Sequence, residues 1–204
     1  LVFPCTCSRK DIAQLQKSSN SHVYPGTCRK HSKTDHPLHA DRIKAHQGEI
    51  FFTDAIQGKQ YFDLQTEIGD FVIKRVDGLF SYQLAVAIDD ATTGITEVVR
   101  GSDLLDSTPR QIHIQQMLGL ATPRYAHLPV ATNMQGQKLS KQTFAKPLTE
   151  KNISETLWEV LQVLGQAPEP AIKKASTNEL WQWAIKHWNI QHVPQQLSFI
   201  YLGQ

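Results

Sequence analysis

The stretch VVRGSDLLDSTPRQIHIQQMLGLATPRYAHLPVATNMQGQKLSKQ, residues 98–142, decides the fold. It begins with the end of an apolar run, GITEVVRG, that is typical of a buried strand and ends at Arg100. In open α/β sheets, ligands bind beyond the carboxyl ends of strands. Arg100 is therefore placed where it could bind a carboxylate in a bidentate manner. The alternative is a structural ion pair with Asp103 or Asp106.

A helix is expected directly after this strand. Ser107 or Thr108 can serve as its N-cap, and Pro109 suits the first helical position. Gly119 fits the residue just past the helix end, where a left-handed backbone is common. The order strand, turn and helix indicates an α/β protein.

The end of the stretch carries two lysines and a hydroxyl on one short loop, Lys138-Leu139-Ser140-Lys141. Two ammonium groups so close repel each other, which favours a bound anion between them. A polyphosphate is the obvious candidate, because lysine binds phosphate as a point charge. The alternative is a solvated basic turn after Gly136.

Three cysteines form a candidate metal site. Cys5 and Cys7 are one residue apart, and the turn signal Pro25-Gly26 is expected to bring Cys28 back toward them. A structural zinc ion takes four ligands in a tetrahedron and prefers thiolates. Three thiols cannot all pair as disulfides, and because no secretory signal is found, we expect a reduced, cytosolic context.

The fourth zinc ligand is open from the residues alone. His22 and His31 are the usual candidates, because imidazole is a common zinc ligand. Three thiols without a metal are the alternative to a site of any kind.

The other segments give coarser expectations. Residues 29–48 are basic, and we expect a solvated loop leading into a short helix, with RNA contact as the alternative. EIFFTDAI, KQYFDLQ and DFVIKRV, within residues 49–76, are expected strands. A helix capped by Ser81 should follow. Two amphipathic helices are expected in ISETLWEVLQVLG and TNELWQWAIKHW, the second capped at Ser176 or Thr177. Trp181 and Trp188 lie on one face of the last, which favours helix packing over base stacking.

Composition sets limits on the class of protein. The chain has 204 residues, of which 40% are hydrophobic and 20% charged, as in globular proteins. The net charge is only +2, so any surface for nucleic acid must be a local patch. No apolar run approaches membrane-spanning length. The start, LVFPCTCSRK, lacks Met and is too short for a signal peptide, and we expect the natural protein to continue on its N-terminal side.

Several ordered motifs together resemble the class I aminoacyl-tRNA synthetases of the glutamyl/glutaminyl group. KLSKQ resembles the second signature loop of that group, K-hydrophobic-S-K-[SRQ]. The resemblance extends over a long span with three further motifs in order. These are RGSDLLDSTPRQ, then LG, then P-x-Y-x-H-x-P (Pro123, Tyr125, His127, Pro129). The likeness runs from about Cys5 to Gln142, and more weakly to the C-terminus. Within the group it is greatest to the small glutamyl-Q tRNA(Asp) synthetases, which lack an anticodon-binding domain.

The resemblance implies roles for particular residues. Lys141 would bind ATP and stabilise charge during adenylate formation, supported by Lys138 and Ser140. Tyr82 and Arg100 match the positions that bind glutamate. The small synthetases of this group have a zinc site with the pattern C-x-C…Y-x-x-x-C. The resemblance therefore implies zinc ligands at Cys5, Cys7, Tyr24 and Cys28. ATP, with Mg²⁺, would be a substrate.

The resemblance also implies an architecture and partners. We expect an α/β fold, part of a Rossmann-like class I catalytic domain with a zinc-binding insertion and a small helical C-terminal subdomain. The expected division is 1–80 for the zinc-binding, strand-rich insertion, 81–142 for the second half of the nucleotide-binding domain, and 143–204 for the helical subdomain. The expected partners are glutamate, ATP and the anticodon region of tRNA(Asp), bound by a monomer without membrane contact.

The sequence departs from the family pattern in one respect, because the HIGH-like first signature does not occur in these 204 residues. Activity is therefore predicted for the complete protein. The residues after KLSKQ are too few for an anticodon-binding domain, which favours transfer of glutamate to queuosine in tRNA(Asp). The alternatives are a truncated ordinary glutamyl-tRNA synthetase and a non-catalytic, zinc-stabilised RNA-binding module.

Overall fold

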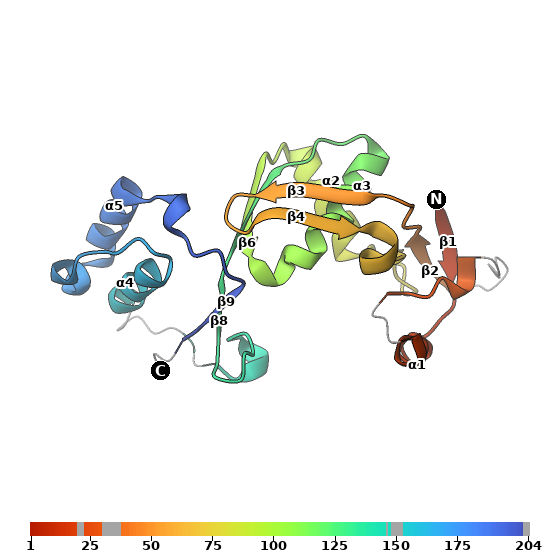
Figure 1. The fold of residues 1–204 in the computed structure, drawn as a ribbon, viewed down its shortest axis with the longest axis horizontal. Helices are drawn as coiled ribbons and strands as arrows, with labels where there is room; N and C mark the ends of the chain where they lie inside the picture. The colour runs from red at the N-terminus through yellow and green to blue at the C-terminus, as the bar shows by residue number, and fades with distance from the viewer. Residues whose placement is uncertain (20–22, 30–37, 146, 148–152, 202–204) are drawn as a thin grey trace. The chain divides into compact units, whose positions relative to one another are not determined.

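The computed structural model of the chain describes residues 1–19, 23–29, 38–145, 147 and 153–201 (Figure 1). Helices and mixed sheets alternate along the chain, which confirms the α/β expectation. The described chain forms two compact units. The first comprises Leu1–Thr53, Lys59–Val98 and Leu105–Arg124, and the second Asp54–Gly58, Val99–Leu104 and Tyr125–Gln204. The domain division expected from the sequence stays a prediction.

The first unit contains a three-stranded antiparallel sheet in the order β1-β2-β5, with β1 at Val2–Cys5, β2 at Ala40–Ile43 and β5 at Phe71–Lys74. The short helix expected after the basic loop is wrong, because Ala40–Ile43 is a strand paired on both sides. The expectation that this segment is solvated is also wrong for Arg42. Its side chain is buried, lies over an aromatic ring and donates to the Asp70 carbonyl at 3.0 Å.

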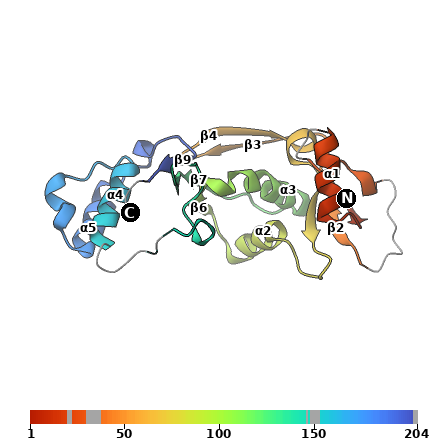
Figure 2. The same ribbon diagram turned by 90° about the horizontal axis from the view of Figure 1, so that it is seen from below.

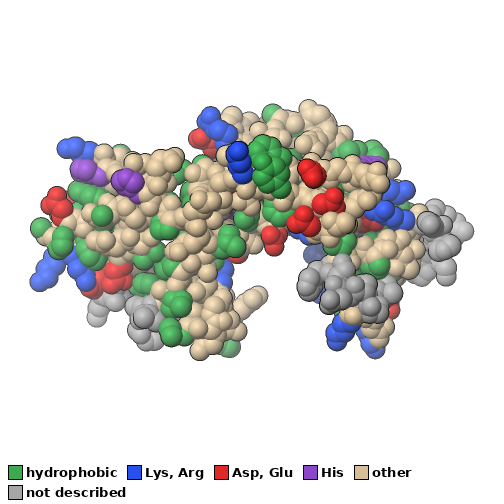
Figure 3. Space-filling model, viewed as in Figure 1, with side chains coloured by type: hydrophobic (Ala, Val, Ile, Leu, Met, Phe, Trp, Pro, Cys, Tyr) green, Lys and Arg blue, Asp and Glu red, His purple; other side chains and the backbone are tan. Residues whose placement is uncertain are grey.

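Strands β3 (Glu49–Asp54) and β4 (Gly58–Asp63) form where strands were expected. Burial alternates along β3, so that Ile50, Phe52 and Asp54 are buried. On the other face, the rings of Phe51 and Tyr61 lie 4.7 Å apart and are exposed. A hydrophobic patch is visible over these strands in Figure 3. A short π-helix, Leu64–Ile68, follows β4.

Two helices of the first unit lie side by side, α2 (Tyr82–Thr93) and α3 (Thr108–Leu118) (Figure 2). The Ser81 side chain caps α2 by accepting from the backbone N–H of Leu84, as expected. For α3, Ser107 is the N-cap residue, although its side chain makes no capping bond. Gly119 ends the helix at φ 66°, a left-handed conformation that glycine adopts without strain.

A four-stranded sheet has the order β4-β3-β7-β6, with β6 at Glu97–Gly101 and β7 at Arg124–Leu128. The pairing of β3 with β7 is parallel, with Asp54 opposite Tyr125. The sequence predicted that GITEVVRG is a buried strand ending at Arg100. The strand is present, but it is not buried. Val99, within this strand, is 64% exposed.

The second unit also contains a parallel strand pair, β8 (Val130–Thr132) with β9 (Ser198–Ile200). Its helices are α4 (Ile153–Val163) and α5 (Thr177–His187), and α5 begins with the expected Ser176 cap. Short 3-10 turns occur at Ser102–Ser107, Lys141–Thr143, Pro170–Lys174 and Ile190–His192. None of the helices in the described ranges has the length and apolar character that crossing a bilayer requires.

Helices α4 and α5 pack together with an open apolar groove of about 280 Å³ between them. Trp181 and Trp188 line it, together with Leu161 and Ala184. Both tryptophans therefore belong to the helix-packing face, as expected. They are half-exposed, so this face is covered only in part.

Candidate functional site

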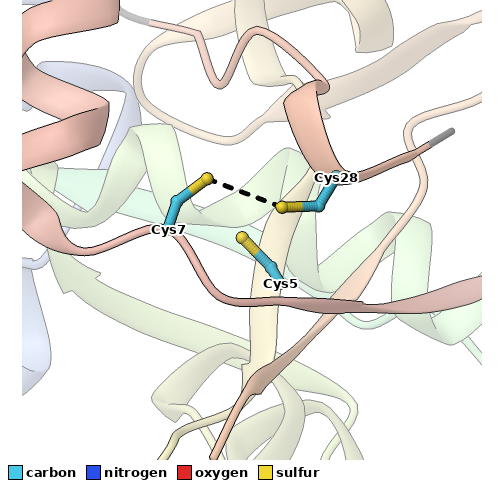
Figure 4. A group of neighbouring side chains, drawn as sticks. All are labelled: Cys5, Cys7 and Cys28. Carbon is cyan, nitrogen blue, oxygen red and sulfur yellow. Dashed lines mark hydrogen bonds between the residues drawn. The ribbon is translucent and has the colours of Figure 1, made fainter. Parts of the chain in front are cut away.

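Three thiols lie together in the first unit. The Sγ atoms of Cys7 and Cys28 are 3.5 Å apart, and all three sulfurs lie within 4.8 Å of one another (Figure 4). Cys5 ends β1, and helix α1 (Arg9–Ser19) begins just after Cys7. Gly26, at φ 75°, makes the turn into the 3-10 helix Thr27–Arg29, which brings Cys28 to the other two.

The phenol of Tyr24 lies against the thiols. Its Oη is 3.3 Å from Cys5 Sγ and 3.7 Å from Cys7 Sγ, and it accepts the backbone N–H of Cys28 at 3.0 Å. The guanidinium of Arg42 lies 4.0 Å from the centre of the Tyr24 ring. The cluster thus consists of three sulfurs and one oxygen, with a cation beside it.

Burial and hydrogen bonds set the charges of these groups. Burial raises the pKa of the Cys7 thiol to about 11. Burial also raises the pKa of Cys28, but hydrogen bonds from Tyr24 and from the Thr6 backbone outweigh it and bring this pKa down to about 7. Burial raises the pKa of Tyr24 far above its usual range. Of the Cys7 and Cys28 thiols, that of Cys28 therefore loses its proton more readily near neutral pH.

This donor set fits a zinc ion in size and chemistry. Zinc binds thiolate sulfur at about 2.3 Å in a tetrahedron, which separates two sulfurs by about 3.8 Å. The 3.5 Å between Cys7 and Cys28 is close to that value. Tyr24 would supply the fourth donor, and Arg42 would offset part of the negative charge. His22 and His31, the other candidates, lie outside the described residues.

An ion pair fixes the turn that carries Cys28. Arg29 donates two hydrogen bonds to the buried carboxylate of Asp70, both at 2.5 Å. The same carboxylate accepts the backbone N–H of Ala45 at 2.8 Å. Arg29 was expected in a solvated basic run, and its pairing with Asp70 corrects that expectation. The cysteine turn is thereby tied to the segment that leads into β5.

Tyr82 is the first residue of α2 and is half-exposed. It lines a cavity of about 690 Å³ in the first unit. Cys7, Arg42 and Arg75 line the same cavity. Cys7 of the thiol cluster and Tyr82 therefore border one hollow, which sequence spacing alone did not indicate.

Arg100 lies in β6, within the second unit. Its Nε donates to Nε2 of His127 at 3.0 Å, and one terminal nitrogen donates to the Leu104 carbonyl at 3.4 Å. The guanidinium carbon is 5.5 Å from the centre of the Tyr125 ring. Of its two candidate carboxylate partners, Asp103 binds Lys138 at 2.7 Å. The side chain of Arg100 is thus held by β7 and by its own following turn.

Sequence reasoning missed the role of Asp54 and saw His127 only as part of a motif. Both side chains are fully buried and lie 2.6 Å apart, and His127 contacts Arg100. Two signals could have found them. The alternation in EIFFTD places Asp54 on the buried face, and a carboxylate buried there requires a partner.

The KLSKQ loop lies in the second unit and is held by backbone contacts. Thr143 Oγ1 accepts the backbone N–H of Ser140 at 2.9 Å, and the Leu139 N–H donates to the Ala131 carbonyl at 2.8 Å. Lys138 pairs with Asp103, so repulsion between the lysines no longer requires an anion. Lys141 is exposed and has no ion pair within the described part of the chain.

With this geometry described, comparison with known proteins gives the family. Residues 8–170 match the family described as tRNA synthetases class I (E and Q), catalytic domain. The chain belongs to this family. The match covers most of the chain and confirms the resemblance found in the motifs. An ATP substrate is expected for members of this synthetase family.

Curated relatives agree with this family assignment. Proteins named glutamyl-Q tRNA(Asp) synthetase from Aromatoleum aromaticum, Thiobacillus denitrificans and Methylococcus capsulatus are 51%, 47% and 47% identical to the chain. The alignments cover 97%, 95% and 95% of this chain, and 62%, 64% and 63% of those proteins. The chain thus spans less than two thirds of the length of the relatives it matches.

Solved structures support the fold. The crystal structure of glutamate-tRNA synthetase from Elizabethkingia anophelis matches with a TM-score of 0.69 at 21% identity, over 97% of this chain and 48% of that one. A glutamate tRNA ligase from Elizabethkingia meningosepticum matches with a TM-score of 0.67 at 20% identity, over 96% and 46%. At such identities the likeness shows the fold alone.

The thiol cluster gives the first testable prediction. Protein prepared without chelator should contain about one zinc ion per chain by metal analysis. Cys5→Ser and Cys28→Ser should lose the metal and lower the melting temperature, because binding of structural zinc contributes folding free energy. Tyr24→Phe keeps three thiols and should retain zinc with weaker affinity. Full zinc content in both cysteine variants would exclude the site.

Proposed function

We propose that the full-length protein activates glutamate with ATP to glutamyl-adenylate and transfers the glutamyl group to the queuosine base of tRNA(Asp). The observation that supports it most is the family match together with the shared name of the relatives at 47–51% identity. Glutamate and tRNA(Asp) are the molecules that this name contains. Queuosine as the acceptor base is part of the proposal and rests on the resemblance.

The architecture is proposed in the same terms. The four-stranded sheet with α2 and α3 would be part of a Rossmann-like nucleotide-binding domain. The segment with the thiol cluster would be a zinc-stabilised insertion, and α4 and α5 a helical C-terminal subdomain. Zinc in a closed four-ligand site would fix the insertion and take no part in the chemistry.

Arg100 and Tyr82 are proposed to bind glutamate. A guanidinium is planar and always charged, and it binds a carboxylate through two parallel hydrogen bonds. The contacts of Arg100 with His127 and Leu104 support this role, because they hold the side chain in one orientation. Tyr82 begins a helix and borders the cavity of about 690 Å³, where its phenol can donate to a ligand oxygen.

Lys141 is proposed as the main catalytic residue, with Lys138 and Ser140 in support. Attack of the glutamate carboxylate on the α-phosphorus of ATP forms the acyl-phosphate bond and releases pyrophosphate. Positioned lysines would stabilise the charge that develops on the departing oxygens, and Mg²⁺ bound with ATP would offset part of the same charge. Lys141 is exposed on a loop that its backbone contacts hold in place, which suits this task.

Glutamate-dependent exchange of ATP and pyrophosphate by the full-length protein tests the proposal. Exchange should require glutamate and ATP together, without added tRNA. A zinc-stabilised RNA-binding module would show no exchange. An ordinary glutamyl-tRNA synthetase would transfer glutamate to the 3′ end of tRNA(Glu). The proposed enzyme should instead attach labelled glutamate to tRNA(Asp), and the label should remain after the 3′ end is removed.

Arg100→Ala should weaken glutamate use far more than ATP use. The KM for glutamate should rise about a hundredfold, because a charged hydrogen-bond pair is lost, whereas the KM for ATP should change less than about twofold. Arg100→Lys should restore only part of the loss, since an ammonium cannot reproduce two parallel bonds. Equal losses for both ligands would point to a structural role for Arg100.

Lys141→Ala should slow adenylate formation about a hundredfold or more, because its interaction grows in the transition state. The KM values for ATP and glutamate should change much less. Thermal melting should be nearly unchanged, since Lys141 is exposed. Lys141→Arg is the matched variant that keeps the charge. Normal exchange by Lys141→Ala would remove the loop from the mechanism.

A further inference from the structure

One carboxylate in the second unit is buried and surrounded by donors. Asp54 Oδ1 accepts the backbone N–H groups of Ile56, Gln57 and His127 at 3.0, 2.8 and 3.0 Å. Its Oδ2 lies 2.6 Å from Nδ1 of His127. Burial raises the pKa of Asp54, but the hydrogen bonds from His127 and from the backbone outweigh burial and lower it. The side chain is therefore an anion that only accepts hydrogen bonds.

This anion determines which nitrogen of His127 carries the proton. Asp54 accepts only, so Nδ1 of His127 must donate to it. On the other side, Nε of Arg100 lies 3.0 Å from Nε2 of His127, and a guanidinium only donates. The neutral imidazole with its proton on Nδ1 is the one form that satisfies both neighbours. A proton on Nε2 would face the N–H of Arg100.

We propose that Asp54 and His127 are positioning residues for substrate recognition, which set the orientation of the Arg100 guanidinium through the imidazole tautomer. This inference rests on the proposed function, in which Arg100 binds glutamate. The bond to Nε restricts rotation of the guanidinium, so its plane is fixed before a ligand arrives. A carboxylate that needs two parallel bonds is sensitive to that plane.

The burial of the pair supports a positioning role. Both side chains are 0% exposed, so neither can touch a bound substrate directly. Of the two nitrogens of His127, one faces Asp54 and the other faces Arg100. The backbone N–H groups that Asp54 Oδ1 accepts account for the carboxylate, but they do not require an imidazole between Oδ2 and Arg100. Orientation of Arg100 gives the pair a function that apolar residues cannot supply.

Asp54→Asn tests the tautomer directly in the full-length protein. The amide keeps the shape, and its oxygen can still accept from the backbone. Its NH₂ would donate to Nδ1, so His127 would carry its proton on Nε2, facing Arg100. We expect the KM for glutamate to rise about tenfold, with the KM for ATP within about twofold of the wild type.

Two His127 variants separate orientation from folding. The Oε1 of His127→Gln can reach the position of Nε2 and accept from Arg100, whereas His127→Asn places its amide nearer Asp54. The KM for glutamate should therefore be closer to the wild-type value in His127→Gln than in His127→Asn. This order should hold whichever of the two variants has the lower melting temperature. The reverse order would overturn the inference.

The double variants decide whether the pair acts through Arg100. In an Arg100→Ala background, Asp54→Asn should change glutamate KM by less than about twofold, because residues that act through one group are not additive. Additive effects would overturn the inference. Gln166→Met removes buried hydrogen bonds elsewhere in the unit and is the control, with lower stability and unchanged glutamate KM. If Arg100→Ala alone leaves glutamate KM unchanged, the proposed role of Arg100 fails instead.

Discussion

The carboxylate of Asp54 is the interaction on which the second unit depends. It ends β3, fixes the turn at Ile56 and Gln57, and holds the imidazole of His127 on β7. From that turn, Gln57 donates to the carbonyls of His127 and Gln196 at 2.8 and 2.9 Å. Three segments distant in sequence thus share one network around a single charge. An unpaired anion would be costly in such a buried place, so the hydrogen bonds specify how these segments meet.

The first unit is organised by a second buried carboxylate. Asp70 binds Arg29 after the cysteine turn and the backbone of Ala45 after β2. Arg42 joins this network through the Asp70 carbonyl and places its cation over Tyr24. The geometry of the thiols is therefore supported by a layer of ion pairs and hydrogen bonds outside the cluster. Such surroundings orient metal ligands and tune their charge.

The helices and the turns were predictable because their signals are local. Ser81, Gly119 and Ser176 act on backbone groups only a few residues away, and the structure places each at the expected helix end. The approach of Cys28 to Cys5 and Cys7 followed from one turn dipeptide in the same way. For the proposed site, local patterns and family resemblance supplied Arg100 and the KLSKQ lysines, whose roles stay predictions.

Contacts between distant segments were not predictable from one sequence. The sequence predicts a solvated Arg42, but in the structure its side chain is buried and bonds to the Asp70 carbonyl. Asp54 is the last residue of an expected strand, and only the structure shows its contact with His127. The apolar run around Val99 predicts burial, yet the exposure of this side chain depends on what packs against that face of β6. The Lys138 pair with Asp103 likewise joins residues 35 apart and changes the charge argument for the loop. These features depend on topology, which local propensity does not encode.

The pairing of β8 with β9 has a consequence for the order of folding during synthesis. Thr132 Oγ1 donates to the Phe199 carbonyl across 67 residues, and β8 leads directly into the KLSKQ loop. As the chain leaves the ribosome, β8 emerges long before its partner. Parallel strands joined by a long connection form late, because the entropy of closing the loop is lost before the contacts are gained. The pairing that holds β8, the strand before the lysine loop, is therefore completed only after α4 and α5 have been translated.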